Sequence, residues 1–145
     1  MSTVNSSSVI PLIPVSWGEL IDKITILEIK AERLDGASRL AVVRELTELN
    51  RLGENITSRA DVKDLKSQLA DTNAELWHIE NSIRKKEDRR EFDSVFIDLA
   101  RAVYTKNDRR ASLKRQINLL TGSSLSEVKS YPRYGEQLME SSAKE

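Results

Sequence analysis

The sequence predicts an all-α protein, a four-helix arrangement built on a long antiparallel, coiled-coil-like hairpin. Three observations predict this fold. Apolar residues recur in alternating steps of three and four over residues 62–83 and 96–120, which is the heptad spacing of packed helices. Five glycines and three prolines in 145 residues are fewer than a sheet with many turns usually needs. Charged residues make up 32% of the chain, which is typical of long helices with solvated faces.

A chain of this length is sufficient for one domain. We expect residues 1–14 to be a disordered N-terminus followed by an extended apolar strap laid over the helices, because Pro11 and Pro14 prevent a continuous helix. The two prolines also suit a docking segment for a protein partner. Residues 15–135 are predicted to form the single helical domain, and residues 136–145 a frayed tail.

The first two helices are predicted from residues that commonly begin or end a helix. Ser16 is placed to cap a helix over about residues 17–34, because its hydroxyl can accept a hydrogen bond from the amide of Glu19. A second helix over about residues 37–52 is predicted to end at Gly53. The connection between them is short, so the two helices should be antiparallel neighbours.

The third and fourth helices, over about residues 59–87 and 90–120, carry the heptad pattern. At about 1.5 Å per residue each would be roughly 45 Å long. If the chain turns near residues 89–90, the two apolar seams face each other. Their inward positions are Val62, Leu65, Leu69, Leu76, Ile79 and Ile83 on one helix, and Phe96, Leu99, Val103, Leu113, Ile117 and Leu120 on the other.

One polar layer interrupts the seams. Thr72 is the polar seam position of the third helix, and the spacing places it opposite Lys106 of the fourth. Arg110 is the next seam position along, while Glu75 and Asn107 lie within one turn of the same level. These five residues are the candidate ligand-binding residues of the protein.

Two interpretations of the layer remain open. In one, Lys106 and Arg110 lay their aliphatic stems over the seam and pair with Asp71 or Glu75, which would fix the register of the helices. In the other, the two cations line a pocket for an anionic ligand, because buried charges gather at functional sites. The first helix would complete that pocket with Lys30 or Arg33.

Several kinds of chemistry are excluded by composition. The chain has no cysteine, which excludes disulfides, thiol catalysis and thiolate metal sites. His78 is its only histidine, so Glu75 and His78 make at most half of a di-iron motif, and the usual zinc sites are absent. We therefore predict no metal site and no cofactor. No residue is identified as catalytic, which favours a function other than catalysis.

Charge is unevenly spread along the chain. Residues 84–115 hold 11 basic and six acidic residues, a net charge of +5, whereas residues 1–83 carry a net charge of −4. A polyanion could bind the basic hairpin tip, but interleaved acidic residues weaken its field, so nucleic acid is not expected as a partner. With no signal peptide and no apolar run of about 18 residues, we expect a cytoplasmic protein without a membrane span.

Three stretches resemble a known family: VSWGELIDKITILEIKAERL, then ELWHIENSIRKKEDRREFDSVFIDLARAVYTKNDRRASLKRQIN, then GSSLSEVKSYPRYG. They are similar to small bacterial proteins classed only as a domain of unknown function, and the resemblance covers about residues 15–135. It implies no catalytic or binding residue. Members of this family are sometimes encoded beside glycosyltransferase or tetratricopeptide-repeat genes, which implies a setting in cell-surface polysaccharide metabolism.

Three functional hypotheses follow. The first is a protein-interaction or assembly module. The two long helices extend past what the two shorter helices can cover, so we expect their uncovered surface to bind a second copy. The second is a small helical enzyme, or a binder of an anionic metabolite, that uses the inward Lys/Arg layer. The third is polyanion binding at the basic hairpin tip.

Overall fold

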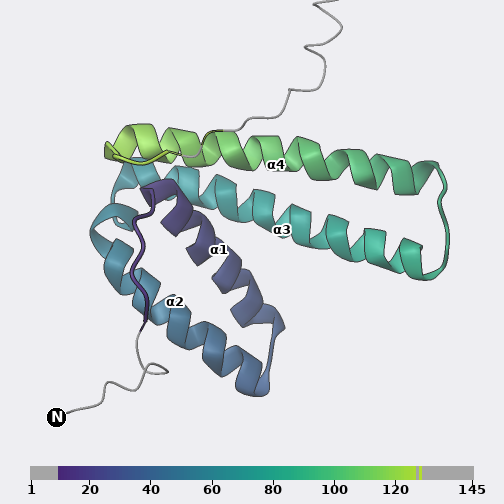
Figure 1. Ribbon diagram of the computed structural model, residues 1–145, viewed down its shortest axis with the longest axis horizontal. Helices are drawn as coiled ribbons and strands as arrows, with labels where there is room; N and C mark the ends of the chain where they lie inside the picture. The colour runs from purple at the N-terminus through teal and green to yellow at the C-terminus, as the bar shows by residue number, and fades with distance from the viewer. Residues whose placement is uncertain (1–9, 127, 129–145) are drawn as a thin grey trace, which may run out of the picture.

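The computed structural model describes residues 10–126 and 128, and these residues form four helices and no strand. The helices are α1 (Trp17–Arg33), α2 (Gly36–Thr57), α3 (Ala60–Asp88) and α4 (Ser94–Thr121) (Figure 1). The prediction of an all-α protein with four helices is therefore confirmed. The predictions for residues 1–9 and 136–145 lie outside the described residues. None of the four helices is both long enough and apolar enough to cross a membrane.

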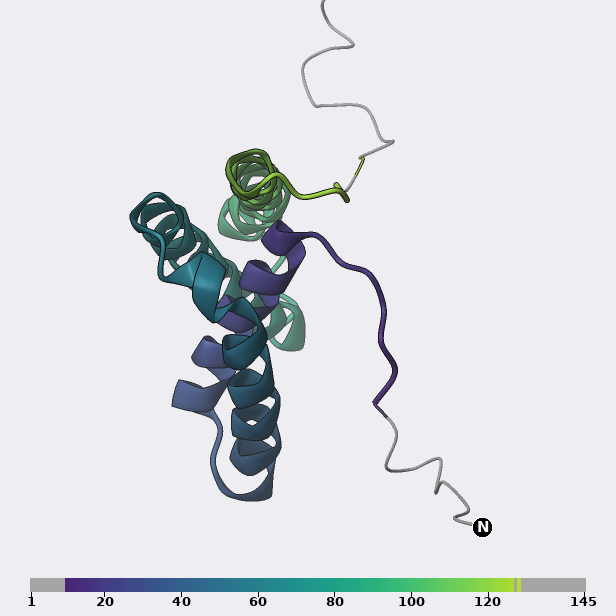
Figure 2. The same cartoon turned by 90° about the vertical axis from the view of Figure 1, so that its left-hand side faces the viewer.

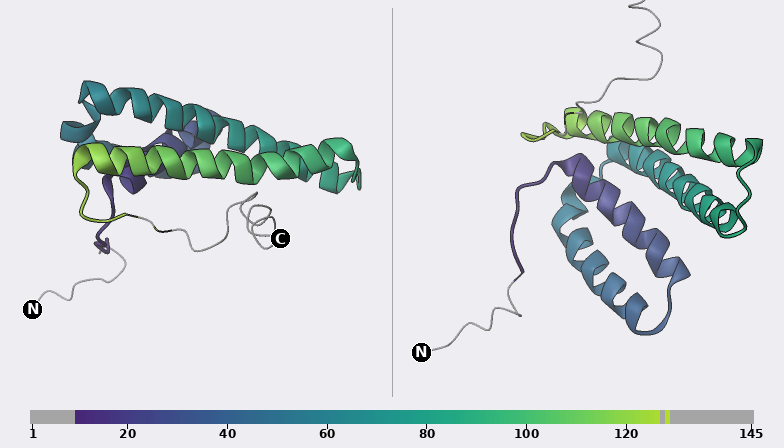
Figure 3. Two further views of the ribbon diagram at one scale, coloured as in Figure 1. Left: turned by 90° about the horizontal axis from the view of Figure 1, so that it is seen from above. Right: turned by 45° about the vertical axis from the view of Figure 1, so that its right-hand side comes forward.

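The helices are arranged as two pairs. α3 and α4 run side by side in opposite directions and are joined by residues 89–93, and α1 and α2 do the same around residues 34–35 (Figures 1 and 3). α1 crosses one end of the α3–α4 pair and contacts both of its helices, while α2 lies on the outer side of α1 (Figure 2). The other end of the α3–α4 pair projects beyond α1 and α2.

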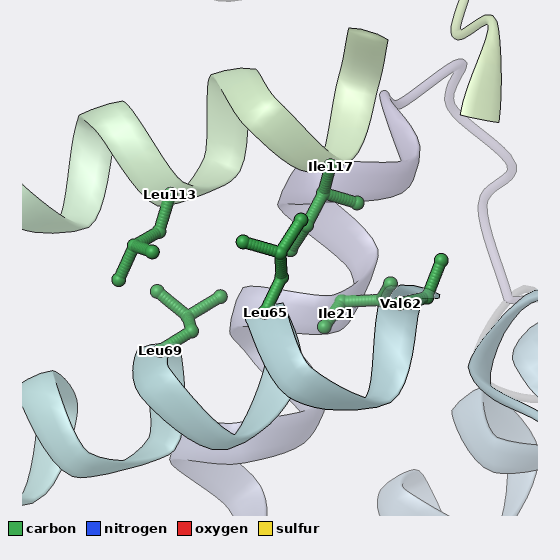
Figure 4. Close-up of a cluster of buried hydrophobic side chains, with 6 residues drawn as sticks. All are labelled: Ile21, Val62, Leu65, Leu69, Leu113 and Ile117. Atoms are coloured by element: carbon green, nitrogen blue, oxygen red, sulfur yellow. The ribbon is translucent and has the colours of Figure 1, made fainter. Parts of the chain in front are cut away.

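The core lies where α1, α3 and α4 meet. Six buried side chains from these three helices pack together there: Ile21, Val62, Leu65, Leu69, Leu113 and Ile117 (Figure 4). All six have lost at least nine-tenths of their accessible surface, and this burial supplies the main hydrophobic stabilisation of the fold.

The start of α1 is held tightly against the end of α4. The Ser16 hydroxyl accepts a hydrogen bond from the amide of Glu19 at 3.1 Å, so the predicted cap is confirmed. Gly18 follows, and its amide donates to the side-chain oxygen of Asn118 at 2.7 Å. A Cβ atom at Gly18 would lie 2.5 Å from the carbonyl oxygen of Lys114. Only glycine permits the two backbones to approach so closely.

The prediction that Gly53 ends the second helix is wrong, because α2 continues to Thr57. Gly53 is buried inside the helix, where a Cβ atom would meet Leu20 and Ile24 of α1 at ordinary contact distances of 3.6 and 3.5 Å. The glycine therefore marks the packing surface between α1 and α2 rather than a helix end.

The predicted start of the fourth helix near residue 90 is also wrong. Arg90 has a φ of 55°, in the left-handed region that interrupts a right-handed helix. α4 begins at Ser94 instead, after Asp93, whose carboxylate accepts a hydrogen bond from the amide of Phe96 at 3.0 Å. Lys86 donates to the same carboxylate at 2.8 Å and to Glu91 at 3.3 Å. These bonds close the turn between α3 and α4.

Residues 10–15, called the arm below, precede α1. They are extended rather than helical, as the two prolines require. Their side chains do not lie over the core as predicted: Ile10, Leu12 and Ile13 are 75%, 94% and 74% exposed. The arm leaves the start of α1 and runs crosswise to the α3–α4 pair (Figures 1 and 2).

Candidate functional site

The residues of the predicted polar layer do not form one connected group in the structure. Thr72 is buried, and its hydroxyl donates to the carbonyl of Gln68 in its own helix at 2.9 Å. Lys106 and Glu75 form an ion pair between α4 and α3, which is one of the two pairings expected for Lys106. Asn107 is half-buried beside it. Arg110 pairs with a residue that was not expected, in α1.

Arg110 binds Asp22 of α1. Its guanidinium donates two hydrogen bonds to the Asp22 carboxylate, from Nε at 2.8 Å and from a terminal nitrogen at 2.5 Å. The amide nitrogen of Asn73 donates to the same carboxylate at 3.0 Å and to the hydroxyl of Thr25 at 2.9 Å. Thr25 in turn donates to the backbone carbonyl of Asp22 at 2.7 Å. Three helices therefore meet in one buried polar network.

Two further ion pairs tie α1 to the same end of the α3–α4 pair. Lys114 of α4 donates to Glu19 at 2.7 Å, with its side chain almost fully buried. Lys66 of α3 donates to Glu28 at 3.1 Å. Together with the Asp22 network, these contacts join α1 to α4 through Glu19 and to α3 through Glu28, so they fix how α1 lies across the two helices.

The polar network is closed. Among the described residues, no buried side-chain nitrogen or oxygen lacks a hydrogen-bond partner. Both cations of the predicted layer, Lys106 and Arg110, face a carboxylate of this chain. An anionic ligand would therefore compete with Glu75 for Lys106 and with the buried Asp22 for Arg110. The arrangement therefore favours the register interpretation of the layer over the pocket interpretation.

Arg33, in the last turn of α1, lies against α3. Its guanidinium is 5.8 Å from the ring centre of Trp77, and one of its nitrogens is 3.2 Å from the Nε2 atom of His78. Among the described residues, no group of three His, Cys, Asp or Glu side chains is placed to hold a metal ion.

Beyond the polar network, the α3–α4 pair extends past α1 and α2 (Figure 1). Residues 77–107, called the projecting half below, contain no buried residue, although the heptad pattern continues through them. Ile83, Phe96, Leu99 and Val103 are only half-buried there, because α1 and α2 do not extend to this end (Figure 1). The packing of the projecting half therefore depends mainly on the contact of α3 with α4, and Arg33 of α1 touches it at Trp77 and His78.

Apolar side chains remain exposed on the projecting half. Ile97 and Tyr104 are both 47% exposed, and a spacing of seven residues places them on the same face of α4. Ala100 lies between them on that face. Near the turn, Phe92 packs edge-to-face against Phe96 with ring centres 5.2 Å apart and is also about half exposed. We call Phe92, Ile97, Ala100 and Tyr104 the apolar face.

Sequence reasoning missed both the Asp22 network and the apolar face. Asp22 adjoins Ile21 and precedes Ile24 by two residues, and an acidic residue among these inward positions was the available signal for a buried partner. The apolar face was visible as a second stripe, since Ile97 and Tyr104 each directly follow a seam residue, Phe96 or Val103. A stripe wider than the seam indicates a helix that packs on more than one side.

Comparison with known proteins gives one match. A family described as "Family of unknown function (DUF6165)" matches residues 12–136, which include all four helices. No curated protein and no solved structure matches the chain.

Proposed function

Because the chain belongs to this family of unknown function, we propose a function from its geometry: a cytoplasmic assembly module that self-associates through the projecting half of the α3–α4 pair. In this proposal the polar network and the core hold α1 rigidly at one end. The other end presents its apolar face to a second molecule. The heptad spacing adds the proposal that α3 and α4 coil around each other over this half.

The apolar face carries the proposal. Half-exposed Ile97, Tyr104 and Phe92 lie on a part of the chain that has no buried residue of its own. Exposed apolar side chains on one face of a helix are a feature of interaction sites. Covering it would also stabilise a part of the α3–α4 pair that contains no buried residue.

The other two hypotheses have less support from the geometry. Binding of an anionic metabolite in the polar layer would require breaking the ion pairs of Lys106 and Arg110. Polyanion binding at the turn would compete with Asp93 and Glu91 for Lys86. An accessory role in cell-surface polysaccharide metabolism, implied by the family resemblance, is compatible with an assembly module and belongs to the proposal as its setting.

Sedimentation equilibrium over a wide concentration range tests the proposal. We expect the unmodified protein to dimerise and the variant Ile97→Asp/Tyr104→Asp to be monomeric. A matched control places the same two charges on exposed leucines of α2, as Leu40→Asp/Leu52→Asp, and should leave the dimer intact. A monomer at every concentration of the unmodified protein would overturn the proposal, as would equal dimerisation of both variants.

A further inference from the structure

We infer that one end of the molecule enters the surface of a lipid bilayer, and that this contact depends on apolar side chains rather than on charge. The end in question lies where α1 begins and α4 ends. It consists of the arm and of residues 122–126 and 128, which follow α4. We call these two segments the uncharged end. The inference goes beyond the proposed self-association, which uses the opposite end of the α3–α4 pair (Figure 1).

Charged side chains are absent from both segments and from the residues that join them to the helices. The sequence has no Asp, Glu, Lys, Arg or His from residue 1 to residue 18, and none from residue 116 to residue 126. In the whole chain, 32% of the residues are charged, so this absence distinguishes the end from the rest of the surface. A bilayer excludes charged side chains and accepts apolar ones. The composition of the uncharged end therefore matches a lipid surface.

The two segments leave the bundle together. The amide of Trp17 donates to the hydroxyl of Ser123 at 3.2 Å, and the amide of Gly18 donates to the side-chain oxygen of Asn118 at 2.7 Å. From this point both segments run out on the same side of the molecule (Figures 2 and 3). One flat surface can therefore contact both of them.

The large apolar side chains of these segments are open to solvent. Such exposed apolar groups are a feature of protein and membrane interaction sites. Their transfer out of water is favourable in proportion to the area removed from it, so a partner that covers them gains that free energy. Six side chains are between 42% and 94% exposed: Ile10, Leu12, Ile13, Val15, Leu125 and Val128.

The backbone of the arm also suits a lipid surface. Pro11 and Pro14 have no amide hydrogen, so two of its six residues have no donor to remove from water. Unpaired donors exclude extended backbone from the hydrocarbon interior, so we place the arm at the depth of the headgroups, where its other donors stay bonded. A protein groove requires side chains at fixed positions, whereas a lipid surface does not. This difference favours lipid, because the six side chains come from two separate segments.

Flotation with vesicles of phosphatidylcholine, which carry no net charge, tests the inference. We expect the unmodified protein to float with them equally at about 0.05 and 0.5 M salt, because apolar contact is not screened. Leu12→Ser/Ile13→Ser changes only exposed arm side chains, and its partition coefficient should fall at least about tenfold. The matched control Leu40→Ser/Leu52→Ser removes two leucines of α2 that are 62% and 63% exposed, and should bind like the unmodified protein.

Three results would overturn the inference. The first is an unmodified protein that does not float with these vesicles; if the arm variant then also fails to self-associate, the partner of the arm is a second copy. The second is an equal loss of binding in the arm variant and in the α2 control. The third is binding that requires anionic lipid and disappears at high salt, since basic side chains would then make the contact.

A polarity-sensitive fluorophore locates the contact, because the chain has no cysteine of its own. On Leu12→Cys or Leu125→Cys, its emission should move to shorter wavelength when phosphatidylcholine vesicles are added, whereas on Leu40→Cys it should not move. Adding Ile97→Asp/Tyr104→Asp to Leu12→Cys separates this inference from the proposed function, because the shift should persist in a protein that no longer self-associates. Equal shifts at residues 12 and 40 would contradict the inference.

Discussion

Arg110 of α4 and Asp22 of α1, 88 positions apart in the chain, are joined by two hydrogen bonds of 2.8 and 2.5 Å. The Asp22 side chain is only 2% exposed, and its carboxylate accepts hydrogen bonds from this guanidinium and from the side chain of Asn73. The geometry is the two-point arrangement that only arginine offers a carboxylate. This pair sets the position of α1 along α4.

Replacing Arg110 with leucine should destabilise the protein by about 3 kcal/mol, because it leaves the Asp22 carboxylate buried beside fewer donors. Chemical denaturation followed by circular dichroism measures the change. The double variant Asp22→Leu/Arg110→Leu should recover most of the loss, since an apolar pair can replace a buried ion pair. A single variant as stable as the unmodified protein would show that the pair has no structural role.

Gly18 and Gly53 should respond oppositely to alanine. At Gly18 the added methyl group would meet the carbonyl oxygen of Lys114 at 2.5 Å, so Gly18→Ala should cost about 1–3 kcal/mol through forced separation of α1 and α4. At Gly53 the nearest atoms are at ordinary contact distance, so Gly53→Ala should gain up to about 1 kcal/mol of helix propensity. Thermal unfolding of the two variants compares them directly, and a shift of the same sign in both would contradict the packing described.

The two parts of the heptad seam, in the core and in the projecting half, should contribute unequally to the free energy of unfolding. Leu113 is fully buried in the core, and Leu113→Ala should cost about 3 kcal/mol or more. Leu99 occupies an equivalent seam position in the projecting half but is half-buried, so we expect Leu99→Ala to cost roughly 1 kcal/mol in the monomer. Denaturant titration at low protein concentration makes this comparison. Equal losses would mean that the projecting half is as well packed as the core.

The start of α4 should loosen in acid. A hydrogen bond from Lys86, and a second from the amide of Phe96, lower the pKa of Asp93. A carboxyl whose pKa is lower in the folded state stabilises fully above its unfolded pKa, about 3.9. That contribution is lost as the pH falls through the lower, folded pKa. The amide resonance of Phe96 should therefore shift below about pH 4 in the unmodified protein. Asp93→Asn, which keeps a cap without the charge, should remove the transition.

Helix content, the cap at Ser16 and the pairing of Lys106 with Glu75 were all predictable from the sequence, because each depends on residues within one helix or on facing heptad positions. The errors at Gly53 and Arg90 have a common cause. A glycine reads as a helix end unless its tertiary neighbours are known, and the turn between α3 and α4 is set by Arg90 adopting a left-handed backbone. Local patterns do not contain that information.

The partner of Arg110 was not predictable for a different reason. Heptad spacing predicts the register of α3 against α4, but it does not predict where α1 crosses these two helices. The crossing is decided by Gly18, Asn118 and the ion pairs of α1, which link residues about 40–100 positions apart. The prediction for the arm was wrong for a similar reason. An apolar segment next to a helical bundle is expected to cover the bundle, but the side chains of the arm face solvent.

The short connection at residues 89–93 has a consequence for the order in which the molecule assembles. α3 and α4 are adjacent in the chain, so their contacts close a small loop and can form early in folding. Docking of α1 onto this pair must close longer intervals, such as the 51 residues between Asp22 and Asn73, and should come later. In hydrogen exchange, amides of α2 should then open at lower free energy than those of α3 near Leu69. The polar network would be the last part of the native structure to form.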